Sequence, residues 1–211
     1  MPFGILPNGS LAITPNMTRH SNYLSIRHRA KPIPYGGDGV LREDGDANYG
    51  FKYVKGDEAA LRAIPELAKD SALLDLALAI NSHQTGLFSV GCVSGPIDDD
   101  QGHRDSGYIE FAINSKSAIA DAKNYFPIFF HFDRFLHTSN FSAPTSFNWE
   151  LEGATFTEYG NSSGFTCTIF INTGYSATRE EATHIWAESL GALAHFLQSV
   201  PSESSDFIYP Q

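Results

Sequence analysis

The feature that most constrains the fold is a pair of extended segments followed by a capped helix. Residues 147–158 and 165–173 are rich in aromatic and β-branched side chains, which favour strands. The Tyr, Gly, Asn and Ser residues that join them are typical of a hairpin loop. Residues 178–200 begin with the capping box Thr178-x-x-Glu181 and place apolar side chains on one face. This part of the chain therefore predicts an antiparallel strand pair covered by an amphipathic helix.

The same order of strand, strand and helix occurs once upstream. Residues 87–93 and 108–114 read as strands joined by a polar loop, residues 94–107. Residues 125–136 fit both a helical and an alternating pattern, and Pro127 suits a first helical turn, so we expect a kinked or two-part helix. Short links between paired strands indicate antiparallel pairing. We therefore expect an α+β fold, a mainly antiparallel sheet built from two strand-strand-helix units with helices packed on the sheet.

A strand and a kinked helix are expected to precede these units. Residues 22–29 alternate as a strand does, residues 31–50 resemble a loop, and residues 51–54 suit a short strand. Residues 57–81 carry helical apolar spacing. Pro65 lies inside that segment, and proline removes a helical hydrogen bond, so we expect a kink or a break there.

Length and composition favour one domain. The 211 residues divide into an irregular N-terminal segment (1–21), a single α+β domain (22–200) and a polar C-terminal tail (201–211). A hydrophobic content of 42% excludes a disordered chain. The chain has no secretory signal pattern, no apolar run of membrane-spanning length and two cysteines without disulfide-framework spacing. We expect a cytoplasmic protein that does not bind a membrane.

The net charge of −10 is unevenly distributed. Residues 1–37 carry four bases and no acid, whereas the rest of the chain is strongly acidic. An acidic protein binds nucleic acid poorly, because neutralising the phosphates requires a basic face on the protein. The basic segment either docks on the acidic body or leaves Arg27 and Arg29 to bind a small anion. The acidic body favours a basic partner protein, since complementary potentials steer encounter.

The densest polar cluster is the predicted loop before residue 108. Successive carboxylates repel one another there, and a divalent cation would relieve the repulsion. The sequence His131-Phe132-Asp133 repeats the His-x-Asp pattern of this loop, and on a strand both of its side chains would share one face. The alternative to a metal site is that the acidic loop is a solvated hairpin and that His131 and Asp133 form a partly buried hydrogen-bonded pair. A metal-dependent hydrolase would use catalytic His103, Asp105, His131 and Asp133, with Asp98, Asp100, His103 and Asp105 as metal ligands.

No intact catalytic or cofactor motif occurs in the sequence. The segment around Cys92 and Ser94 only echoes a nucleophile elbow, which favours a binding role over catalysis while leaving the hydrolase as the alternative, and we expect no cofactor. Aromatic residues are abundant between 125 and 149, and most of them belong in a core. The first hypothesis is therefore a protein of the inhibitor, immunity or accessory type, which binds another protein, with a ligand-binding aromatic pocket as a third possibility. Its expected binding residues are the anchors Phe141 and Trp149 and the acidic Asp98, Asp99 and Asp100.

Overall fold

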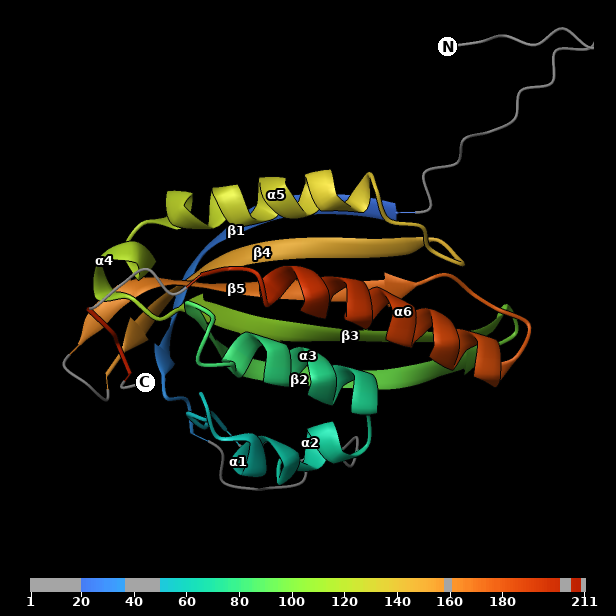
Figure 1. Ribbon diagram of the computed structural model, residues 1–211, viewed down its shortest axis with the longest axis horizontal. Helices are drawn as coiled ribbons and strands as arrows, with labels where there is room; N and C mark the ends of the chain where they lie inside the picture. Colours follow the sequence, from blue (N-terminus) through green and yellow to red (C-terminus); the bar gives the residue numbers. More distant parts are fainter. Residues whose placement is uncertain (1–19, 37–49, 158–160, 202–205, 210–211) are drawn as a thin grey trace, which may run out of the picture.

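The computed structural model describes residues 20–36, 50–157, 161–201 and 206–209, and in them the chain has an α+β fold with six α-helices and a five-stranded mixed sheet (Figure 1). The strand order is β1-β4-β5-β3-β2. Among the described helices, none has the length and apolar character needed to span a membrane. The elements are β1 (His20–Ile33), α1 (Glu58–Arg62), α2 (Pro65–Ala68), α3 (Ser71–Asn81), β2 (Leu87–Asp99), β3 (Gly102–Ile113), α4 (Lys116–Ile119), the 3₁₀ helix η1 (Ala122–Tyr125), α5 (Phe126–Leu136), β4 (Thr145–Phe156), β5 (Ser162–Thr173) and α6 (Arg179–Leu197).

The sheet combines antiparallel and parallel pairing. Strands β2 and β3, β3 and β5, and β4 and β5 pair antiparallel. Strand β1 lies at the edge and pairs parallel with β4, in a register that aligns His20 with Thr145 and Ile33 with Phe156. Parallel neighbours require a long crossover connection, and the segment that holds α1 to α5 and the β2–β3 hairpin supplies it.

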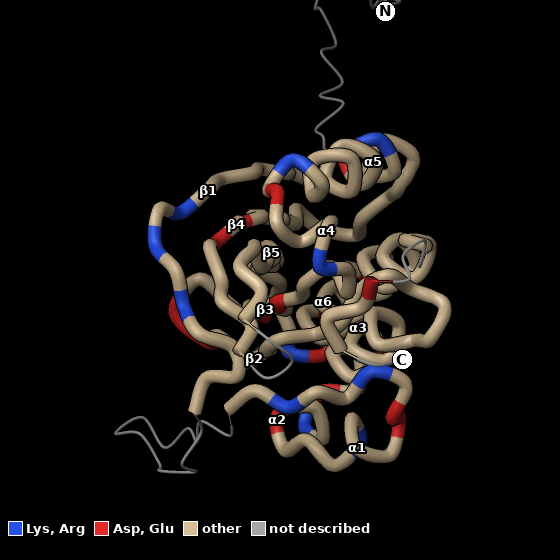
Figure 2. Tube along the Cα trace, turned by 90° about the vertical axis from the view of Figure 1, so that its left-hand side faces the viewer, with Lys and Arg blue, Asp and Glu red and all other residues tan. Residues whose placement is uncertain are grey.

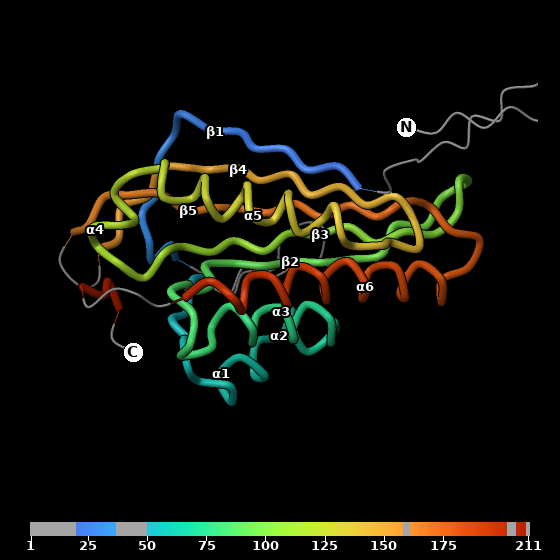
Figure 3. The backbone as a smooth tube through the Cα atoms, turned by 45° about the horizontal axis from the view of Figure 1, so that its top comes forward, coloured from blue at the N-terminus to red at the C-terminus, as the bar shows by residue number. Residues whose placement is uncertain are grey.

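Helices α3, α5 and α6 pack on one face of the sheet, whose edge strand β1 runs beside β4 (Figures 2 and 3). The layers are therefore the sheet and these helices. The main core between these layers contains Phe111, Trp149, Ile169 and Leu190, all nearly inaccessible to solvent. At the start of α6, the Thr178 hydroxyl oxygen accepts a hydrogen bond from the Glu181 amide at 3.2 Å, as the capping box predicts. The amphipathic C-terminal helix is thereby confirmed.

A second, smaller core combines aliphatic side chains with aromatic rings from distant parts of the chain. The Tyr53 and Tyr209 rings stack with centroids 4.4 Å apart, and the Phe88 ring meets Tyr209 edge-on at 5.2 Å. The expected strand at 51–54 is wrong, because this segment contributes side chains without joining the sheet. In the predicted polar tail, the described residues Ile208 and Tyr209 are buried in this core.

The segment expected as one kinked helix forms three short helices. The expected break occurs at Pro65, which begins α2 because its missing N–H is not needed in a first turn. The Asp70 carboxylate then caps α3 by accepting from the Leu73 amide at 3.0 Å. Residues 125–136 are the end of η1 followed by α5, so the two-part helix is confirmed and the alternating strand pattern there is wrong.

Strands β2 and β3 extend well beyond the predicted limits. Residues 94–107, expected as a loop, form most of a long hairpin in which Asp98 aligns with His103 and Pro96 with Asp105. Ladder hydrogen bonding thus extends through a polar segment that lacks the apolar alternation on which the prediction relied. The hairpin tip lies at the same end of the molecule as the N-terminus of α6 (Figure 1).

Candidate functional site

The tip of the β2–β3 hairpin carries a network of charged side chains. The His103 Nδ1 atom lies 2.7 Å from Asp98 Oδ1, and Arg179 Nη1 of α6 donates to the same carboxylate oxygen at 3.0 Å. Arg179 also forms an ion pair with Asp105. One guanidinium from the first turn of α6 therefore links both strands of the hairpin to the helix.

Residues just before α6 reinforce this link. The Tyr175 hydroxyl donates to Asp99 Oδ2 at 2.6 Å, and the Arg104 guanidinium carbon lies 5.0 Å from the centre of the Tyr175 ring, a cation–π geometry. The backbones of His103 and Ser176 exchange two hydrogen bonds of 3.0 and 2.8 Å. The hairpin tip is thereby held against the segment that leads into α6.

The carboxylates of the network differ in their pKa. The hydrogen bond from His103, with the nearby Arg179, lowers the pKa of Asp98, and the hydrogen bond from Tyr175 lowers the pKa of Asp99. Burial raises the pKa of Asp105, although Arg179 opposes this effect. The exposed Asp98 and Asp99 carboxylates are therefore negatively charged at neutral pH.

A surface groove of about 530 Å³ adjoins the network. Its residues include Tyr175, which connects it to Asp99, and the exposed Glu180 and Glu181 of α6. Neither glutamate forms an ion pair with any residue that the structure describes. We define the acidic end as Asp98, Asp99, Asp100, Asp105, Glu180 and Glu181 with Arg104 and Arg179, six carboxylates against two guanidinium groups.

The basic residues of β1 form a different arrangement. Arg27 Nε lies 2.6 Å from Glu150 Oε2, Arg29 pairs with Glu152, and Lys31 Nζ lies 2.6 Å from Glu110 Oε1 and 3.7 Å from Glu152 Oε2. Figure 2 shows these bases in succession along β1. The three bases of this segment that the structure describes thus pair with acidic residues of the sheet, and the anion-binding candidates Arg27 and Arg29 already face carboxylates, while Arg19 lies outside the described residues. We call the six residues Arg27, Arg29, Lys31, Glu110, Glu150 and Glu152 the β1 charge layer.

The two His-x-Asp pairs have different surroundings. His131 and Asp133 lie on α5, where Asp133 Oδ1 accepts from Asn22 of β1 at 3.3 Å, whereas His103 and Asp105 belong to the hairpin network. On a helix, residues two apart do not share a face, so His131 and Asp133 point apart. Among the described residues, no group of three or more His, Cys, Asp or Glu side chains is placed to hold a metal ion.

Phe141 and Trp149, expected as exposed anchors, are buried. Their side chains are 4% and 1% exposed, and the Trp149 ring packs edge-on against Phe129 with centroids 5.7 Å apart. Alternation along β4 directs Trp149 toward the helices, so an exposed position was wrong. The exposed large apolar side chains among the described residues are Tyr23, Ile26 and Phe130.

Cys92 has the surroundings of a structural thiol. Burial, followed by the nearby carboxylates of Glu66 and Asp70, raises its pKa to about 12. The thiol therefore stays protonated at physiological pH and is a poor nucleophile. Cys92 lies on β2 and is partly buried.

Sequence reasoning missed the contribution of α6 to the acidic end. In the sequence Glu181 belongs to the capping box, and no motif includes Tyr175 or Glu180. One signal was available, because Arg179 is the single Lys or Arg in residues 135–211 and precedes two glutamates. The long-range pairing of Arg179 with Asp98 and Asp105 depends on the strand order, which local patterns do not reveal.

A scan against protein-family models and searches of curated proteins and of solved structures find no match to the chain. What the acidic end can bind therefore follows from its own residues and their geometry.

Proposed function

We propose that the protein acts by binding another protein, of basic character, through the acidic end. The observation that carries this proposal is the groove in which Glu180 and Glu181 lie unpaired with any described residue, next to the Tyr175 ring. Concave geometry, excess negative charge and an aromatic ring together suit a lysine or arginine side chain of a partner. Inhibitor, immunity and accessory proteins work by this kind of association.

The internal network supports the proposal by fixing the surface in advance. Arg179 and Tyr175 hold Asp98 and Asp99 in place, so a partner would meet a preformed array of carboxylates. Preformed surfaces lose less side-chain entropy on association. Excess charge also raises the rate of encounter with a partner of opposite sign.

The test is capture from a lysate of the source organism on the immobilised full-length chain, followed by affinity measurement with each purified partner. The test variant is Glu180→Gln with Glu181→Gln. The matched control, Glu58→Gln with Asp75→Asn, removes the same two charges from α1 and α3. We expect the wild type and the control to retain the same basic protein, and the test variant to bind it at least tenfold more weakly.

Salt supplies an independent readout. Contacts between exposed charges are screened, so the affinity of the wild type for that partner must fall as the ionic strength rises. Equal retention by all three proteins, an affinity that does not depend on salt, or retention of no basic protein contradicts the proposal.

A further inference from the structure

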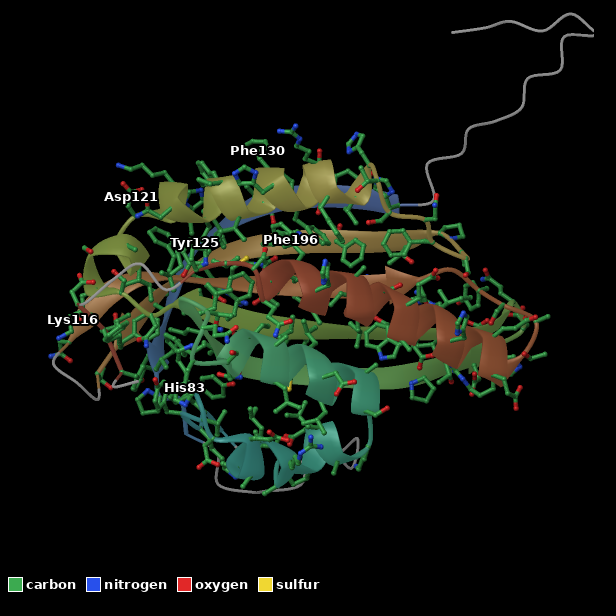
Figure 4. The ribbon with its side chains drawn as sticks, in the orientation of Figure 1. His83, Lys116, Asp121, Tyr125, Phe130 and Phe196 are labelled. Carbon is green, nitrogen blue, oxygen red and sulfur yellow. The ribbon has the colours of Figure 1, made fainter. Side chains whose placement is uncertain are left out.

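Another surface cavity lies at the opposite end of α6. It measures about 690 Å³ and lies where α5, the end of α6 and the turn after β3 converge. Figure 4 labels Phe196, which lies at this end of α6 between α6 and α5. Because α6 has 19 residues, about 28 Å separate its two ends. The cavity is therefore separate from the acidic end, and its volume falls in the range of small-molecule sites.

The floor of the cavity is an uncovered edge of the main core. Leu87, Ile128 and Phe196 form its buried base, and its accessible apolar surface comes from the partly buried Ile113 and Val200 and the exposed Pro127 and Pro201. Contact with an apolar ligand would remove further apolar surface from water, which is favourable. This floor selects a ligand with an apolar body.

The polar residues that line the cavity are uncharged, except that His131 can carry a proton. In a chain with 24 acidic and 14 basic residues, none of the described lining residues is Asp, Glu, Lys or Arg. The lining residues themselves offer no counter-charge to a charged ligand, which would leave water at a substantial cost. The carboxylate of Asp206 adjoins the lining and already accepts hydrogen bonds from Ser115 Oγ at 2.7 Å and from the Ser117 amide at 2.8 Å. The polar lining residues are Asn114, Ser115, Ser117, Asn124, His131 and Ser199.

Several of these polar groups already serve the fold. The Asn114 side chain donates to the Tyr209 carbonyl at 3.1 Å and accepts from its amide at 3.0 Å. The Asn124 amide nitrogen donates to the Ala118 carbonyl at 2.7 Å. The His131 imidazole is exposed at the cavity, and no hydrogen bond or ion pair joins it to another described residue. One imidazole is thus available to a polar head group.

We propose that this cavity binds a small uncharged amphipathic molecule, whose apolar body covers the Leu87–Phe196 floor and whose single hydroxyl or carbonyl head meets His131. The apolar floor accommodates the apolar body of the ligand. The lining residues, which carry no acidic or basic side chain apart from His131, disfavour a charged ligand, and the His131 imidazole positions the polar head group. This site and its ligand class are independent of the binding role proposed for the acidic end.

The test is a titration of the ¹⁵N-labelled full chain with 1-octanol, followed by amide chemical shifts. We expect saturable shifts centred on Ser117, Ala118 and Ser199. Octanoate and octylammonium, which share the same chain length but carry a charge, should bind at least tenfold more weakly. The absence of saturable shifts, shifts centred elsewhere, or equal binding of either ion overturns the proposal.

A cavity-filling variant gives a second readout. Ala118 lines the cavity, whereas Ala187 is exposed on α6 outside it. Ala118→Leu should weaken octanol binding at least tenfold, and the matched control Ala187→Leu should leave it unchanged. Equal octanol binding by both variants overturns the proposal, and if Ala118→Leu does not fold, the shift map of the wild type decides the matter.

Discussion

The β1 charge layer and the acidic end contain the same kinds of ion pair, but the layer is balanced in charge whereas the acidic end has an excess of carboxylates. The layer holds three bases against three carboxylates, and its Glu110 and Glu152 are only 4% and 6% exposed. The acidic end holds two bases against six carboxylates, and its Asp98, Asp99 and Asp100 are exposed. Buried charges must be paired to be tolerated, whereas exposed charges are solvated and need not be. The buried carboxylates of the layer are therefore matched by bases, and the surplus carboxylates of the acidic end are those exposed to solvent.

The largest effect is expected from the removal of Lys31 in the β1 charge layer. The Lys31→Met variant leaves Glu110 buried without its counter-charge, so we expect the free energy of unfolding to fall by about 3 kcal/mol. Urea denaturation measures the loss. Adding Glu110→Gln should recover a large part of it, because the uncompensated charge is then removed. A loss in the free energy of unfolding below about 1 kcal/mol would show that these ion pairs contribute no more than ordinary surface ion pairs do.

An intermediate effect is expected from Arg179, the central base of the acidic end. Arg179→Gln removes contacts to Asp98 and Asp105, but the Asp98 carboxylate stays hydrated. We expect the free energy of unfolding to fall by about 1 kcal/mol in the same assay. A loss as large as that of Lys31→Met would show that the two regions do not differ in the way described.

The smallest effect concerns the pH dependence of Asp98. Its pKa is lowered below 3.8, chiefly by the hydrogen bond from His103. A lowered carboxyl pKa contributes stability above the ordinary value, and this contribution is lost as the pH falls through the pKa of the folded state. The variant His103→Gln should therefore raise the Asp98 pKa, measured by carboxyl-carbon NMR titration. Asp121, whose pKa is lowered by Lys123, serves as the unaffected reference, and an unchanged Asp98 midpoint would contradict the prediction.

The α+β class and the identity of most elements follow from local patterns. The capping box at Thr178, the proline at the start of α2 and the alternation along β4 and β5 each act within a few residues, so the sequence displays them directly. The polar outer half of the β2–β3 hairpin has no such pattern. Its strands are held by pairing between segments, which composition does not reveal.

The acidic end was predictable only in part. Asp98, Asp99 and Asp100 stand out as a run of carboxylates, but Glu180 and Glu181 join them only because α6 starts beside the hairpin tip. The error on Trp149 has a related cause, since alternation predicts two faces of a strand without showing which one the helices cover. Both gaps concern the arrangement of elements in space and not their local structure.

The parallel pairing of β1 with β4 has a consequence for synthesis on the ribosome. Each β1 residue pairs with one that lies about 125 positions later, as His20 does with Thr145. At 5 to 20 residues per second, β1 emerges roughly 6 to 25 s before its partner strand exists. Throughout that interval Arg27 and Arg29 lack their partners Glu150 and Glu152 on β4, whereas the Lys31 partner Glu110 on β3 is synthesised earlier. The positive charges of Arg27 and Arg29 keep the nascent strand hydrated and disfavour its association with other edges.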